Sequence, residues 1–136
     1  MILYDNGIIK LAYDPATDIL EVAYPDLHEF LLAEIKHSID KLTENVNSYD
    51  VKRLLLDSSR TVVAVEAERS REISSYLAAR LCTTRLQKLA RLQSHSSTVE
   101  MTAQQNIQHI ETHLHLPFVL HNFTSREEAI AWLAEK

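Results

Sequence analysis

The fold is decided by residues 51–60, which read Val51-Lys52-Arg53-Leu54-Leu55-Leu56-Asp57-Ser58-Ser59-Arg60. Residues 51–56 become continuously apolar toward their end, which is typical of a strand buried on both faces of a parallel sheet. The polar residues that follow end the strand. Two further strand candidates occur at residues 88–93 and 118–123, and helical patterns separate them. Strands that alternate with helices predict parallel strands joined by right-handed helical crossovers.

Shorter extended segments precede this pattern. Residues Ile2–Asp5 and 8–13 are apolar-rich and are joined by Asn6-Gly7. This pair predicts a two-residue hairpin turn because both positions tolerate positive φ. A second turn is predicted at residues 14–18, and residues 19–24 then alternate between two faces as a strand does. The chain is therefore expected to open with a small antiparallel meander.

Apolar positions at helical spacing predict the long helices. The first is expected to start at Pro25-Asp26 and to leave through a loop at residues 45–50. The second is expected over about residues 66–86. The third carries an apolar face from Val99 onward and is expected to end at Pro117.

Two local signals complete the predicted fold. Residues 61–65 favour an extended chain before the second helix. Thr124 and Glu127 match a capping box, with a hydroxyl at the cap and a carboxylate three residues on, and predict the start of a C-terminal helix. We expect a single α/β domain over residues 1–136, in which the meander leads into a mostly parallel sheet with helices on both faces.

Composition excludes several function classes. The formal net charge of -5 argues against a general nucleic-acid binder, which needs a basic surface. A single glycine is too few for a Walker loop or a dinucleotide fingerprint. One cysteine, Cys82, leaves no internal disulfide. The sequence shows neither a signal-peptide pattern nor a run of roughly 20 apolar residues that would span a bilayer, so a cytoplasmic location is expected.

Polar side chains gather where the predicted parallel strands end, which is where ligands bind in open α/β sheets. The candidate binding or regulatory residues are Asp57, Ser58, Ser59, Ser94, His95, His121 and Asn122. An alternative interpretation is that they are ordinary turn and cap residues. No Gly-x-Ser-x-Gly turn supports a hydrolase, so no catalytic residue is assigned and the chain is not expected to be an enzyme.

Two other clusters of polar residues are possible sites. His109 and His113 are four residues apart on one helical face and His115 follows, but no Glu-x-x-His or Cys-x-x-Cys companion supports a metal site. We therefore expect neither a metal nor a cofactor. A basic stretch that lacks acidic residues consists of Arg80, Arg85, Lys88 and Arg91. It is interpreted as a solvated face, with docking of an acidic partner or a phosphate as the alternative.

Three segments carry a family resemblance: Ile19-Leu20-Glu21-Val22, the strand Arg53–Asp57, and residues 123–133, which end in Ala-x-x-Trp-Leu. Together they resemble the SpoIIAA-like family, part of the broad STAS/Sec14-like group of small bacterial proteins. The resemblance implies a four- or five-stranded, largely parallel sheet between helices, often in homodimers. Some relatives antagonise anti-sigma factors through a serine that the partner kinase phosphorylates, and more distant relatives bind lipids or other apolar ligands.

The phosphorylated serine of that family has two possible positions here. Asp57-Ser58-Ser59 looks like the Asp-Ser-Ser core of the antagonist motif, but Arg60 stands where the motif has glycine. Ser58 is also expected directly at the strand end, whereas the motif starts a helix slightly later. Asp57 then corresponds to the aspartate at the strand end of the family, and the motif position falls near residues 61–66, which contain no serine.

These observations predict a non-catalytic, regulatory or protein-interaction module, possibly acting like an anti-sigma-factor antagonist and forming homodimers. The alternative is a carrier of a small apolar ligand or lipid of the Sec14-like type. Residues 62–65, which are mostly valine and lie beside an apolar helix, would then form a flap over a pocket.

Overall fold

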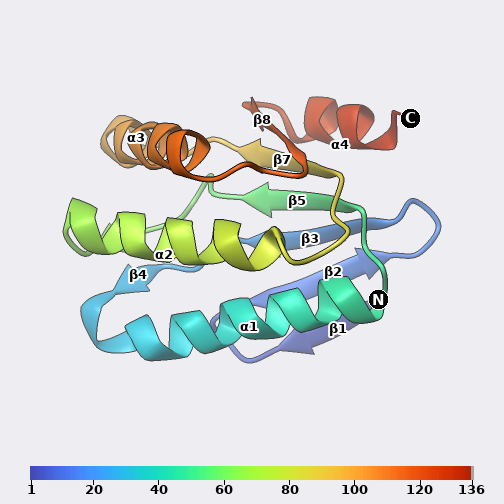
Figure 1. The fold of residues 1–136 in the computed structure, drawn as a ribbon, viewed down its shortest axis with the longest axis horizontal. Coiled ribbons are helices and arrows are strands. Elements are labelled where there is room, and N and C mark those ends of the chain that lie inside the picture. The colour runs from blue at the N-terminus through green and yellow to red at the C-terminus, as the bar shows by residue number, and fades with distance from the viewer. Residues whose placement is uncertain (136) are drawn as a thin grey trace.

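A six-stranded mixed sheet runs through the computed structural model, which describes residues 1–135 (Figure 1). The strand order is β1-β2-β3-β5-β7-β8. The antiparallel part consists of β1 (Ile2–Asp5), β2 (Lys10–Asp14) and β3 (Ile19–Ala23). The parallel part continues from β3 through β5 (Arg53–Asp57), β7 (Lys88–Leu92) and β8 (Val119–Phe123). The predicted fold class is confirmed and is consistent with a STAS-like α/β fold, although the sheet has more strands than the resemblance implied.

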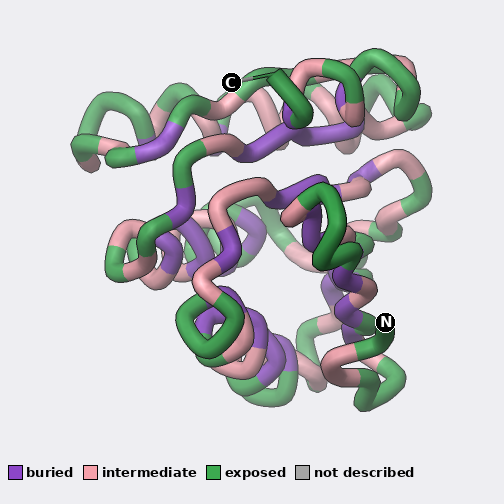
Figure 2. The backbone as a smooth tube through the Cα atoms, turned by 90° about the vertical axis from the view of Figure 1, so that its right-hand side faces the viewer, coloured by how far each residue is buried: buried purple, intermediate pink, exposed green. Residues whose placement is uncertain are grey.

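Helices cover both faces of this sheet, as predicted. The helices are α1 (Leu32–Ser48), α2 (Ala67–Leu81), α3 (Ser97–His113) and α4 (Arg126–Ala134). Leu54 and Leu56 of β5 pack with α1 and α2, whereas Leu55 between them packs with α4. Figure 2 shows that the helices turn their buried residues inward. Within residues 1–135, no helix combines the length and apolar character needed to cross a bilayer.

The first hairpin differs from the prediction. β1 and β2 pair at Asp5 and Lys10, so the loop between them has four residues and not two. Gly7 has φ +83, but Asn6 does not have a positive φ. Instead, the Asn6 side-chain oxygen accepts hydrogen bonds from the backbone N–H groups of Ile8 (2.9 Å) and Ile9 (3.0 Å). This asparagine therefore shapes the loop through its side chain.

The first helix starts later than predicted because Leu27–His28 is strand β4, followed by a short 3-10 helix, η1 (Glu29–Leu31). β4 pairs in parallel with β6 (Val63–Ala64), which confirms an extended chain within residues 61–65. The Asp26 carboxylate accepts a hydrogen bond from the Val62 N–H (2.8 Å) and holds the two segments together. At its other end α1 continues to Ser48, through most of the predicted exit loop.

The second helix ends at Leu81, before the predicted residue 86. The Thr83 hydroxyl donates to the Arg80 carbonyl (2.6 Å), and the Thr84 hydroxyl donates to the Leu81 carbonyl (2.7 Å). The Arg80 and Leu81 carbonyls also accept from the backbone N–H groups of Thr83 and Thr84 (3.1 Å each), so residues just after the helix satisfy its last carbonyl groups. Helix α3 likewise ends at His113, ahead of Pro117, and Leu114 already has an extended backbone.

The capping box of the last helix is displaced by one residue from the prediction. Ser125, and not Thr124, is the N-cap, and its hydroxyl accepts from the Glu128 N–H (3.3 Å). The carboxylate three residues on is then that of Glu128 and not that of Glu127. A hydroxyl cap is present as predicted, but one residue later, because adjacent threonine and serine both fit the pattern.

Candidate functional site

The alternation of side chains along β8 divides the predicted polar rim between two faces of the sheet. The His121 ring stacks on the indole of Trp132 in α4, with centroids 4.5 Å apart and planes at 21°. The Asn122 side chain points to the opposite face, where its oxygen accepts from Arg91 Nη1 (3.1 Å). His121 and Asn122 therefore do not belong to one surface.

Asp57 lies on the same face of the sheet as α4, because side chains alternate along β5 and Leu56 lies on the pocket side. Its negative charge also helps to raise the pKa of Arg126 in α4. Its Oδ1 atom accepts from the backbone N–H (2.9 Å) and the hydroxyl (2.6 Å) of Ser59. The His95 N–H donates to the Ser59 carbonyl (3.2 Å). No hydrogen bond within residues 1–135 joins Asp57 to a histidine.

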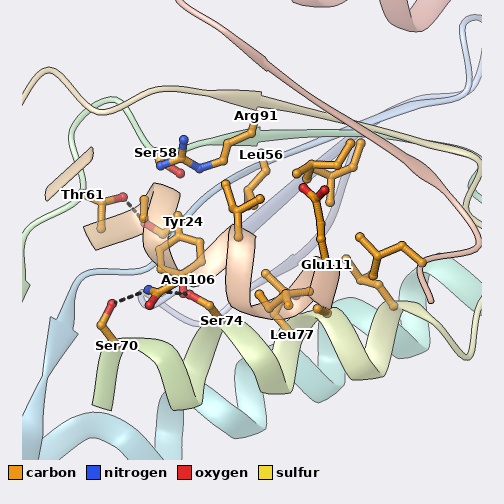
Figure 3. Close-up of a pocket in the computed structure, with 18 of the residues that line it drawn as sticks. Tyr24, Leu56, Ser58, Thr61, Ser70, Ser74, Leu77, Arg91, Asn106 and Glu111 are labelled. Carbon is orange, nitrogen blue, oxygen red and sulfur yellow. Dashed lines mark hydrogen bonds between the residues drawn. The ribbon is translucent and has the colours of Figure 1, made fainter. Parts of the chain in front are cut away.

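Ser58 lies beside a pocket on the other face of the sheet. It is 4% exposed, and its N–H donates to the Leu92 carbonyl (3.1 Å). Its side chain borders a pocket of about 100 Å³ between α2, α3 and the parallel strands (Figure 3). An engineered apolar cavity of roughly 150 Å³ takes up benzene, so a volume of this order suits a small organic group.

The walls of the pocket are mainly apolar. They comprise Leu56, Val63, Leu77, Ala78, Leu81, Leu89, Val99, Ala103, Ile107, Ile110, Leu116, Phe118 and Leu120. Helix α3 forms the outer wall, and Asn106 and Ile110 are its buried residues. Its inner face carries the small side chain of Ala103 and the polar side chain of Asn106, which fill less space than leucines would. This leaves an open volume between α3 and the sheet.

One end of the pocket carries a network of neutral polar groups. The Asn106 amide nitrogen donates to the hydroxyls of Ser70 (3.1 Å) and Ser74 (3.4 Å). The Tyr24 hydroxyl lies 3.2 Å from the Ser74 hydroxyl. Figure 3 shows these groups together, with Glu111 farther along the two helices. Burial raises the pKa of Tyr24, although its hydrogen bond to Ser74 and the charge on Arg91 act in the opposite direction.

Arg91, which also lines the pocket, is buried and forms an ion pair with the partly buried Glu100 behind the wall. Arg91 Nη1 lies 2.8 Å from Glu100 Oε2, and Nη2 lies 2.9 Å from Oε1. The carboxylate also accepts from the Ser94 N–H (2.8 Å) and from the Gln104 amide. Burial opposes the ionisation of Glu100, but these hydrogen bonds, led by those from Arg91, outweigh it and hold the pKa of Glu100 below its ordinary value.

The interpretation of the basic stretch as one solvated face is wrong for Arg91, which is 6% exposed. The other three side chains make separate contacts with Asp40, Asp50 and Trp132. Arg80 Nε lies 3.1 Å from Asp40, Arg85 Nη1 lies 3.5 Å from Asp50, and Lys88 Nζ lies 4.9 Å from the Trp132 ring centroid. No common docking surface results from these positions.

Sequence reasoning missed the polar residues of the pocket, although a signal was present. Ser70 and Ser74 interrupt the apolar face of α2 that carries Ile73 and Leu77. Asn106 does the same on the inner face of α3. Polar side chains inside an apolar helical stripe must find partners when buried. Their spacing was therefore a sign of facing polar groups between two helices.

The histidine cluster is exposed or partly exposed at the end of α3. The rings of His109 and His113 lie 4.1 Å apart between centroids, and His113 Nδ1 lies 2.8 Å from the His109 carbonyl oxygen. Among residues 1–135, no group of three or more histidine, cysteine, aspartate or glutamate side chains is placed to hold a metal ion.

Comparison of the chain with protein-family models, curated proteins and solved structures finds no match. The SpoIIAA-like resemblance therefore stays a prediction.

Proposed function

We propose that this chain is a non-catalytic protein that binds a small, largely apolar ligand in the pocket between α2, α3 and the sheet. The observation that carries the proposal is the combination of apolar walls with a buried polar network at one end. Ligand pockets in proteins have this composition, because apolar walls supply affinity and a few polar groups fix orientation. Val63, which lies within residues 62–65 where a flap is predicted, also lines the pocket, and so does Thr61 just before them.

The polar groups support binding more than catalysis. The Ser58 side chain lines the pocket, where its hydroxyl can meet a ligand. The Ser70 and Ser74 hydroxyls contact Asn106, which is not a base, so neither has the activated geometry of a nucleophile. The proposed role is therefore a carrier or a sensor.

A neutral fluorescent probe tests the proposal. N-phenyl-1-naphthylamine is expected to gain emission when its phenyl ring enters the pocket of the wild-type chain. Ala103→Phe fills the pocket from α3 and is expected to abolish this gain. Gln105→Phe adds the same ring at an exposed position of the same helix and serves as the matched control. Equal probe emission in all three proteins would contradict the proposal.

A regulatory, protein-interaction role is the second candidate, and the position of Ser59 favours it. Its hydroxyl is partly exposed and lies 2.6 Å from the Asp57 carboxylate. A phosphate adds about two negative charges, so phosphorylation here would force the turn open by repulsion. Ser58 is too buried for a kinase to reach. Light scattering of Ser59→Asp and Ser59→Ala tests the predicted homodimer: the first is expected to change the mass and the second is not, and identical masses would remove this candidate.

A further inference from the structure

We infer that the ligand of the pocket is electrically neutral, with a hydroxyl, carbonyl or amide head on an apolar body, and not a carboxylate or a phosphate. This inference rests on the proposed function and names its ligand class. Arg91 is the cation in the pocket wall, and an anionic head would have to bind there.

The charge of Arg91 is already balanced inside the protein. Both of its terminal nitrogens contact Glu100 in a two-pronged arrangement, and Nη1 also donates to Asn122. The side chains of Arg91 and Glu100 are 7% and 17% exposed, so water screens the pair weakly. An entering carboxylate therefore meets a compensated pair and not a free positive charge.

Displacement of Glu100 by a ligand carboxylate is unfavourable for a second reason. Glu100 is held by the Ser94 N–H and the Gln104 amide as well as by Arg91. A ligand that took over Arg91 would leave this carboxylate buried without its counter-ion. Glu111 lines the pocket farther along α3, so an anionic head turned that way would also meet a like charge.

The neutral network offers the alternative partner for a ligand head. Asn106, Ser70 and Ser74 each combine donor and acceptor capacity, and all three line the pocket. Tyr24 adds a phenol that is protonated at neutral pH, since an ordinary tyrosine titrates near about 10 and burial raises the pKa of Tyr24 further. A head that both donates and accepts, such as an alcohol, fits this set without burying a net charge.

Octan-1-ol and octanoate test the inference, since they share a chain and differ in head charge. Octan-1-ol is expected to displace N-phenyl-1-naphthylamine from the wild-type protein at pH 7 at a concentration about tenfold lower than octanoate, a ratio that corresponds to roughly 1.4 kcal/mol. Octanoate that displaces the probe equally well or better would overturn the inference while the pocket proposal stands. If the wild type binds the probe, Ala103→Phe abolishes the gain in emission, and neither compound displaces the probe, the inference fails as well. If the probe never binds, the proposed function fails with it.

Glu100→Gln sharpens the test because it removes the negative charge and keeps the side-chain shape. Octanoate binding is expected to rise about tenfold in this variant, while octan-1-ol binding stays unchanged. Glu127→Gln, at an exposed position of α4 on the other face of the sheet, is the matched control and is expected to change neither. Unchanged octanoate binding in folded Glu100→Gln would overturn the inference. If that variant does not fold, Arg91→Met combined with Glu100→Met replaces it, and preference for octan-1-ol must persist.

Discussion

Arg91 in β7 and Glu100 in the first turn of α3 form an ion pair that ties the outermost long helix to the sheet. Both pairs of charged atoms lie within 2.9 Å, and neither side chain reaches 20% exposure. Elsewhere α3 buries Asn106 and Ile110 and packs mainly along α2. The ion pair therefore fixes the helix that forms the outer wall of the pocket.

Removal of one member of this pair is expected to destabilise the fold strongly. Arg91→Met or Glu100→Met alone leaves an uncompensated buried charge, which costs about 3 to 5 kcal/mol. The double variant removes both charges and is expected to cost less than either single change. Urea unfolding of the four proteins measures this coupling. Additive losses would show that the two side chains do not act as a pair.

Acid is expected to remove the contribution of Glu100. Its pKa is lower in the folded chain than in the unfolded chain, where a glutamate titrates near about 4.3. The stabilisation is therefore complete above the unfolded pKa and is lost as pH falls through the folded pKa. The unfolding free energy of the wild type should fall more steeply below about pH 5 than that of Glu100→Gln. Parallel pH profiles for the two proteins would contradict this prediction.

The sheet was predictable because its signals are local. Residues 51–56, 88–93 and 118–123 are segments of strand length with apolar residues, and helical patterns separate them. The structure places them side by side. The pairing of β4 with β6 was not predictable, because two-residue strands carry no periodicity and depend on contacts between distant segments. The late start of α1 follows from that pairing.

The site was less predictable than the fold. Strand ends placed Ser58 among the candidate residues of a polar rim, and in the structure it borders the pocket. Sequence position alone did not show that His121 and Asn122 face opposite sides of the sheet. Arg91 was predicted to lie on a solvated face because no acidic residue stands near it in the basic stretch. The carboxylate that neutralises it, Glu100, belongs to the following helix. Such pairing depends on tertiary packing, so the order of charges along the chain does not predict it.

The cap of α4 provides a direct test of the one-residue displacement. Ser125→Ala removes the hydroxyl that accepts from the Glu128 N–H and is expected to cost about 1 kcal/mol. Thr124→Ala, one residue earlier and exposed, is expected to change stability by less than about 0.5 kcal/mol. Thermal or urea unfolding of both variants measures the difference. A larger loss for Thr124→Ala would restore the cap position expected from sequence.

The stacked pair of His121 and Trp132 tests the division of the polar rim. Trp132 is the single tryptophan of the chain, so its emission reports on this contact without interference. His121→Ala removes the stacked ring, and it is expected to expose the indole, shift its emission to longer wavelength and cost about 0.5 to 1.5 kcal/mol. Asn122→Ala alters the neighbouring residue, whose partner Arg91 lies on the other face of the sheet, and is expected to leave the emission unchanged. Equal shifts for both substitutions would mean that the two side chains lie on the same face of the sheet. The placement of Arg91 and the pocket on the face opposite to α4 would then be wrong.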